Sequence, residues 1–270
     1  MPPYAYYAVL VAVALVAAAI TAWTFAPALR GPDAARRDVG SHGLAFGGIV
    51  SLLLLSTLAS LPFAQDLRDA PFTLSTFSLA ALATQIPLVL VVYARLIWPR
   101  ALTWQDLGLR PLPLERVLRV GTYTGVAVLL LTILVSLALS RLDLRPNQLD
   151  QYGFVRQAGT PGLIVVLVLV AIAAPIAEEL FFRGFLFGLY RRRQPRWLAY
   201  VVSVAAFGIA HVMPTRMNPQ QALGLVIAIV LLGTILTWTY DRTGSLYPGM
   251  LAHAINNSVG VLALYYVGST

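Results

Sequence analysis

Five ionisable side chains interrupt apolar stretches in the C-terminal half of this sequence: Glu178, Glu179, Arg183, His211 and His253. They include two of the three glutamates and two of the three histidines in the chain. A carboxylate removed from water becomes a stronger base, and an imidazole exchanges protons near neutral pH. This set of side chains is therefore suited to general acid–base catalysis or to proton transfer.

The string AEELFFRGF places Glu179 four residues before Arg183. On a helix these two side chains share a face, with the glutamate N-terminal, which is the favourable orientation for an ion pair. We expect mainly a structural pair, although Arg183 is also able to anchor a substrate carboxylate through a bidentate contact. Glu178 is rotated by about a quarter turn from this pair and keeps a free carboxylate.

Two further helical pairs accompany this string. His253 and Asn257 are four residues apart in HAINN, so an imidazole and a carboxamide project from one face and can act on a single reacting oxygen. Phe207 precedes His211 by one turn in FGIAH, where a core role is expected for its ring. Together, the two histidines favour a functional site over two unrelated interior residues.

The composition indicates the elements that must position these side chains. With 59% apolar residues, 11% charged residues and a mean hydropathy of +0.77, the 270-residue chain has the profile of an integral membrane protein. This excludes soluble enzymes, disordered regulators and secreted disulfide scaffolds. The absence of cysteine excludes disulfides, thiol nucleophiles and thiolate metal sites. All 19 cations are arginines, and 18 of them flank the apolar segments, so the net charge of +8 indicates membrane topology rather than nucleic-acid binding.

Eight apolar stretches approach the roughly 20 residues that a membrane-spanning helix needs. We therefore expect one all-α membrane domain, a bundle of about eight transmembrane helices with an intramembrane polar cavity. The first stretch is predicted to be a retained span, because its apolar run exceeds that of a signal peptide. The predicted spans are Tyr4–Ala26, Leu44–Ala64, Thr73–Trp98, Val117–Leu139, Gly162–Tyr190, Trp197–Met213, Gln220–Tyr240 and Leu246–Val267.

The arginines predict the orientation. In an eight-span bundle, thirteen flank one side and five the other, which places the richer side in the cytoplasm and both termini outside. Counted from the flanking arginines, Glu178, His211 and His253 lie 13, 15 and 11 residues into their stretches. These are depths of roughly 16 to 23 Å. We expect the three side chains to meet in a cavity that opens to the cytoplasmic side.

The patterns E-E-x-x-x-R, F-x-x-x-H and H-x-x-x-N, in this order and on three predicted spans, resemble the CAAX protease and bacteriocin-processing family of intramembrane proteases, which includes the type II CAAX prenyl proteases. TWQDLGLRP at residues 103–111 is similar to a short stretch upstream of the motifs in that family. The resemblance covers roughly residues 100–267. It implies a catalytic core at 99–270 and a variable addition of transmembrane helices at 1–98.

The resemblance implies an endopeptidase that hydrolyses a peptide bond within the membrane. At the matching positions, Glu178 would activate water with the help of His211. His253 and Asn257 would stabilise the oxyanion. The remaining matched residues would support the site or contact the substrate, namely Glu179, Arg183 and Phe207.

Two designs of this site remain open. In one, Glu178, His211 and His253 bind a zinc ion and Glu179 is the base. In the other, there is no cofactor, and Glu178 and His211 activate water directly. The second is slightly favoured, because an asparagine one turn from His253 suits oxyanion donation better than zinc ligation.

Functions of other classes are also compatible with the polar cluster. A membrane scaffold or immunity protein would keep the fold without catalysis, and an ion-coupled transporter would use the same groups to relay protons. As an enzyme, the protein is expected to have a membrane protein or peptide as substrate and the lipid bilayer as its environment. The absence of lysine and cysteine favours the plasma membrane of a bacterium with GC-rich DNA.

In the string GFLFG, Gly184 and Gly188 have the spacing of a G-x-x-x-G motif. Small residues at this spacing allow helices to approach closely. We expect this packing to occur within the bundle rather than between two copies of the chain.

Overall fold

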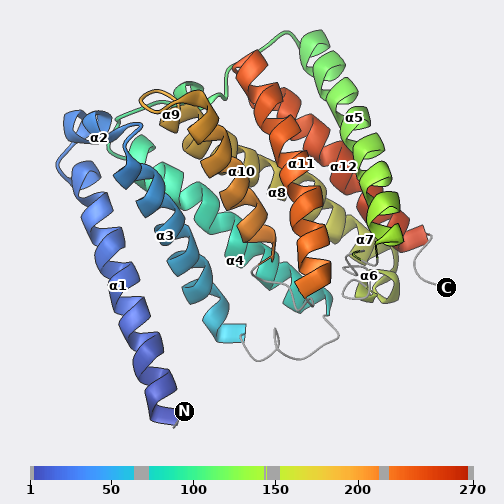
Figure 1. The fold of residues 1–270 in the computed structure, drawn as a ribbon, viewed down its shortest axis with the longest axis horizontal. Helices are drawn as coiled ribbons and strands as arrows, with labels where there is room; N and C mark the ends of the chain where they lie inside the picture. The colour runs from blue at the N-terminus through green and yellow to red at the C-terminus, as the bar shows by residue number, and fades with distance from the viewer. Residues whose placement is uncertain (1–2, 64–72, 143, 145–152, 213–218, 267–270) are drawn as a thin grey trace.

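The structure, a computed structural model, is mainly helical in the residues that it describes, which are 3–63, 73–142, 144, 153–212 and 219–266. Figure 1 shows the helices side by side in one bundle, with α1 at its edge. The helices outside the segment that carries the paired glutamates are α1 (Pro3–Leu29), α2 (Pro32–Asp38), α3 (His42–Ser60), α4 (Leu74–Val92), α5 (Leu114–Arg141), α6 (Phe154–Gln157), α10 (Arg196–Val212), α11 (Pro219–Thr243) and α12 (Tyr247–Tyr266). Short helical turns accompany them at Leu61–Phe63 (η1), Tyr93–Ile97 (η2) and Trp104–Leu107 (η3).

The helices are those of an integral, multi-pass membrane protein, as predicted. Five helical segments of the described chain are long and apolar enough to cross a bilayer, at His42–Phe63, Leu74–Ile97, Leu114–Arg141, Gly159–Tyr190 and Pro219–Thr243. The predicted number of about eight spans is not confirmed. The 17 residues of α10 extend about 26 Å, which is less than a bilayer core, and α12 carries the polar residues His253, Asn256 and Asn257.

The paired glutamates lie on a segmented helix from Gly159 to Tyr190. It begins as α7 (Gly159–Leu167), widens into the π-helical η5 (Val168–Ala173), tightens in α8 (Ala174–Glu178) and widens again in the π-helical η6 (Glu179–Phe187) before α9 (Gly188–Tyr190). Such π segments often occur at functional sites.

Pro175 gives a physical reason for the first π segment. The N–H of Ala174 donates to the carbonyl of Leu169, five residues earlier. In this register the next donor would be residue 175, which is a proline and has no N–H. The carbonyl of Val170 is therefore left without a donor from its own helix.

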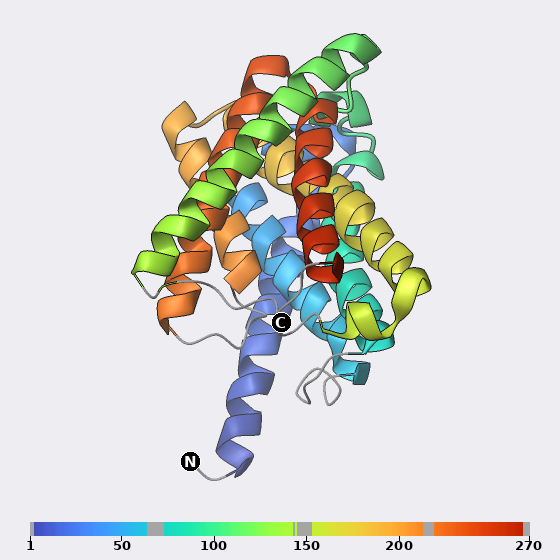
Figure 2. The same ribbon diagram turned by 90° about the vertical axis from the view of Figure 1, so that its right-hand side faces the viewer.

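The arrangement of the helices brings the N-terminal part of the chain against this segmented helix. Helices α3 and α4 pack next to each other, and α4 also packs against η5, α8 and η6. On the other side, α10 packs against α11, and α5 lies along α12 (Figure 2).

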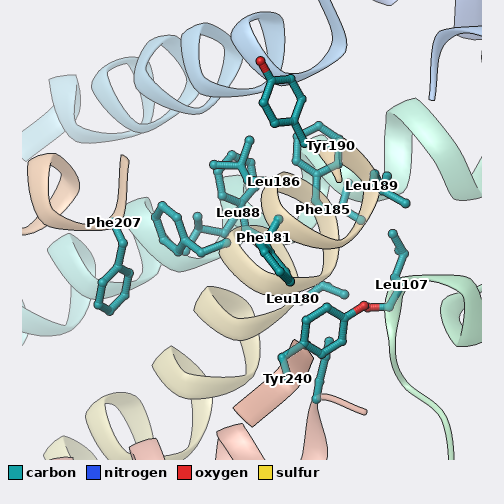
Figure 3. Packing of buried hydrophobic residues seen from close by; sticks show 14 of the residues in the cluster. Leu88, Leu107, Leu180, Phe181, Phe185, Leu186, Leu189, Tyr190, Phe207 and Tyr240 are labelled. Carbon is teal, nitrogen blue, oxygen red and sulfur yellow. The ribbon is translucent and has the colours of Figure 1, made fainter. Parts of the chain in front are cut away.

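An apolar core surrounds the π-helical segment η6. It joins side chains from α3 and α4, among them Leu44 and Leu88, to the buried phenylalanines of η6. Figure 3 shows Phe181 and Phe185 pointing into this core next to Leu88. A Cβ atom at Gly48 of α3 would overlap the Phe185 ring, which shows how closely the two parts pack. The predicted addition at 1–98 and the predicted core at 99–270 thus share one apolar interior.

The backbone of the segment around residues 103–110 lies close to η6 and to the residue that precedes α12. Thr103 and Asp106 form a capping box, and Gly108 adopts a φ of 99°, where glycine is favoured. The carbonyl of Gly108 accepts from the N–H of Leu246, just before α12. A Cβ atom on Gly184 would lie 2.6 Å from the carbonyl oxygen of Leu107. The predicted close packing at this glycine therefore occurs within the chain.

Candidate active site

The ionisable side chains predicted from the sequence meet at one place in the bundle. Glu178 is the last residue of α8, and Glu179 and Arg183 follow in η6. His211 lies in the last turn of α10, and His253 lies in the first half of α12. Three helical segments, far apart in the sequence, therefore each contribute at least one of these groups.

Glu178 lies between the two histidines. Its Oε2 atom is 3.8 Å from Nε2 of His211 and 3.7 Å from Nε2 of His253. This oxygen is buried and has no hydrogen-bond partner among the described residues. The side chains of Glu178 and His211 are 16% and 28% exposed, whereas that of Glu179 is fully buried.

Glu179 forms the fully buried centre of the cluster. Its Oε1 atom accepts from Nη1 of Arg183 at 2.9 Å, which is the ion pair predicted from the spacing. The same oxygen lies 3.2 Å from Nδ1 of His253. Because a carboxylate only accepts, Nδ1 of His253 is the donor in this contact. Glu179 therefore links the arginine of its own helix to the histidine of α12.

Arg183 has all of its contacts inside the protein. Besides Glu179, it donates from Nη2 to the carbonyl oxygen of Gly233 at 3.2 Å. Its guanidinium lies 4.2 Å from the centre of the Phe207 ring, and its side chain is fully buried. These contacts favour the structural interpretation of Arg183 over direct binding of a substrate carboxylate.

Phe207 separates Arg183 from His211 and is fully buried, as expected for a core residue. Its ring centre lies 4.4 Å from that of His211, and its carbonyl oxygen lies 2.8 Å from Nδ1 of His211. A carbonyl only accepts, so the proton of neutral His211 belongs on Nδ1. Nε2 of His211 then presents a lone pair on the side of Glu178.

Asn257 makes a contact that the sequence did not predict. Its Nδ2 atom donates to the carbonyl of Val170 at 2.8 Å, the carbonyl that Pro175 leaves without a helical donor. Its Oδ1 atom accepts from Nδ2 of Asn256 at 3.3 Å. In the described contacts Asn257 is therefore bound to η5, not to an ionisable side chain, and one hydrogen of its amide is left for another acceptor.

The predicted zinc site is not confirmed by the arrangement of its three side chains. Among the described residues, no group of three or more histidine, aspartate or glutamate side chains is arranged to hold a metal ion.

Two residues of this neighbourhood were not among those predicted from the sequence. Gln85 on α4 donates from Nε2 to the carbonyl of Leu169 at 3.0 Å, and Pro175 determines which carbonyls of η5 are free. A buried amide in an otherwise apolar span and a proline three residues before Glu178 were signals available in the sequence.

Fold and site together define a helical, multi-pass membrane protein with a cluster of acid–base groups buried between its helices. Residues 160–259 match the family model described as type II CAAX prenyl endopeptidase, Rce1-like. This segment contains Glu178, Glu179, Arg183, His211, His253 and Asn257. The resemblance to the CAAX protease and bacteriocin-processing family is thus confirmed for the part of the chain that carries the site.

Two curated proteins are similar to parts of the chain. Uncharacterized protein YyaK of Bacillus subtilis is 37% identical over 97 residues, which cover 35% of this chain and 31% of the relative. An uncharacterized 24.3 kDa protein of Escherichia coli is 29% identical over 104 residues, which cover 38% of this chain and 45% of the relative. The chain thus spans less than half the length of either relative. No solved structure matches the chain.

Proposed function

We propose that this protein is an intramembrane endopeptidase that uses Glu178 to activate water against a peptide bond of a membrane protein or peptide. The observation that carries the proposal is the position of Oε2 of Glu178. It is buried, has no hydrogen-bond partner among the described residues, and lies between Nε2 atoms at 3.7 and 3.8 Å. A water bound to this oxygen, between the two Nε2 atoms, would have one strong acceptor and two imidazoles beside it.

The reaction begins when Glu178 accepts a proton from this water, helped by the lone pair on Nε2 of His211. The water oxygen bonds to the carbonyl carbon of the substrate, and the carbonyl oxygen becomes an oxyanion. Glu178 then returns the proton to the leaving nitrogen, and the C–N bond breaks to give a carboxylic acid and an amine. A positioned general base of this kind contributes about 10² to 10⁴ in rate.

His253 and Asn257 supply the donors for the oxyanion. With Nδ1 of His253 donating to Glu179, protonation of the other ring nitrogen gives an imidazolium whose Nε2–H lies on the Glu178 side. The amide hydrogen of Asn257 that Val170 does not take is the second donor. Donors placed in advance at a developing oxyanion are worth about 3 to 4 kcal/mol each.

Glu179, Arg183 and Phe207 support the site in this proposal. The ion pair orients His253, and the Phe207 ring packs against both Arg183 and His211. The catalytic core is residues 99–270, and the helices of 1–98 pack against it. We further place the protein in a bacterial plasma membrane, with both termini outside and the site open to the cytoplasmic side, as the distribution of arginines favours.

The test compares new peptide termini in membranes of cells that express the wild type or Glu178→Gln at equal levels. The substitution removes the base but keeps the shape of the side chain. Glu115→Gln is a matched control, because Glu115 is the remaining glutamate and its side chain is 84% exposed. We expect termini that appear with the wild type and with Glu115→Gln and are absent with Glu178→Gln.

The same experiment separates the alternatives. Identical termini in all three membranes of the native host, under several growth conditions, would reject the protease and leave a scaffold or a transporter.

Zinc analysis of the purified protein tests the design of the site. Zinc near one atom per chain that is lost in His211→Ala would replace direct activation by Glu178 with the zinc design.

A further inference from the structure

Two consecutive carbonyls of η5, those of Leu169 and Val170, accept side-chain hydrogen bonds from two different helices. Val170 accepts from Asn257 on α12, and Leu169 accepts from Gln85 on α4. Glu178 follows Val170 by eight residues on the same helix. The rotation of η5 about its axis therefore determines the direction in which Glu178 points.

Gln85 is built into this contact. Its side chain is 8% exposed, and its Nε2 atom lies 3.0 Å from the carbonyl oxygen of Leu169. Its Oε1 atom is buried with no hydrogen-bond partner among the described residues. In the described contacts, the hydrogen bond to Leu169 is what compensates the burial of this amide. That hydrogen bond therefore holds the Gln85 side chain in place.

The Leu169 carbonyl is also where the π register begins, since it accepts the N–H of Ala174. A second donor at this oxygen, from Gln85, stabilises the π register that ends just before Pro175. Without that register, the Val170 carbonyl would no longer be without a helical donor and directed at Asn257. Asn257 would then lose the acceptor that orients its amide.

We propose that Gln85 is a positioning residue of the active site: through Leu169 it fixes the π-helical segment η5, and thereby the direction of Glu178 and of the Asn257 amide. This inference rests on the proposed function. It makes α4, which lies outside the matched segment at 160–259, a part of the catalytic unit.

Two variants of Gln85 and one neighbouring control test the proposal. Gln85→Met keeps the length of the side chain and removes the donor. Gln85→Glu restores a donor, because a carboxyl group buried in an apolar environment is kept protonated and carries an O–H. Thr84→Val is the control, because Thr84 is exposed on the same helix and bonds only to the backbone carbonyls of Ala80 and Ala81 in the described contacts.

The first readout is cleavage of a peptide taken from the first site mapped with the wild type. We expect kcat of Gln85→Met to fall about tenfold or more, with KM within about twofold, because a misplaced base weakens the chemical step and not substrate binding. Gln85→Glu should recover most of this loss, and Thr84→Val should match the wild type. Equal losses in Gln85→Met and Gln85→Glu would overturn the proposal in favour of simple packing.

The second readout is independent of activity. Hydrogen exchange of the backbone amides in residues 168–178 should be about tenfold faster in Gln85→Met than in Thr84→Val, because Ala174 shares the Leu169 acceptor. Unchanged exchange would refute the positioning role. If the wild type cleaves nothing, the proposed function fails, and faster exchange still establishes that Gln85 fixes η5.

Discussion

Nδ1 of His253 lies 3.2 Å from Oε1 of Glu179, the oxygen that also holds the guanidinium of Arg183. One fully buried carboxylate thus connects a cation of its own helix to an imidazole of α12. A buried carboxylate with two donors on one oxygen is costly to disturb, because each donor loses its partner when the charge is removed.

Glu179→Gln is expected to lower both activity and stability. The amide keeps the size of the side chain, but Arg183 is left as a buried cation without its counter-ion. Removal of one partner of a buried pair costs about 3 to 5 kcal/mol in stability. Thermal unfolding in detergent measures this effect. Glu115→Gln breaks an exposed pair with Arg119 and should change stability by less than about 1 kcal/mol, and an equal effect in both variants would contradict the central role of Glu179.

Pro175→Ala is expected to change stability and activity in opposite directions. Alanine supplies the N–H that proline lacks, and a proline inside a helix costs about 3 kcal/mol relative to alanine. The new donor competes with Asn257 for the Val170 carbonyl. The melting temperature should therefore rise while kcat falls about tenfold. A variant with higher stability and full activity would show that the Val170 contact is dispensable.

Gly184→Ala is expected to separate the helix of the paired glutamates from the segment around Leu107. The added methyl group would lie 2.6 Å from a backbone carbonyl oxygen, which a side-chain rotation cannot relieve. Overpacking of this kind costs about 1 to 3 kcal/mol. Gly260→Ala is the control, because nothing lies within 4 Å of a Cβ at that position. There, alanine should stabilise α12 by about 0.5 to 1 kcal/mol.

Asp106 gives a pH dependence outside the membrane-spanning helices. The backbone N–H and the hydroxyl of Thr103 donate to its carboxylate and lower its pKa below the ordinary 3.8. A lowered pKa means that the contact stabilises the fold above the pKa of the unfolded state and is lost as pH falls through the folded value. The stability difference between wild type and Asp106→Asn should therefore shrink as pH is lowered below about 4. A difference that stays constant with pH would refute this assignment.

The local features of the site could be predicted from the sequence because they depend on helix periodicity alone. The Glu179–Arg183 ion pair follows from a spacing of four residues, and the burial of Phe207 follows from its place in an apolar stretch. The helical membrane fold follows from composition, since a bilayer leaves the backbone few alternatives. The predicted number of spans is not confirmed, because the length of α10 and the polar residues of α12 depart from the average span.

The meeting of the three motifs was expected from their depths, but its geometry was decided by packing. Spacing within one helix says nothing about its rotation against another, so the contact of Glu179 with His253 and the donation from Asn257 to Val170 appear only in the tertiary structure. Gln85 illustrates the same limit, because its partner is 84 residues away. The sequence by itself determined which groups are buried in the membrane and which pair along a helix. Only the packed bundle, with the π segments that shift its register, decided which of them face one another across helices, because that depends on how each helix is rotated against its neighbours.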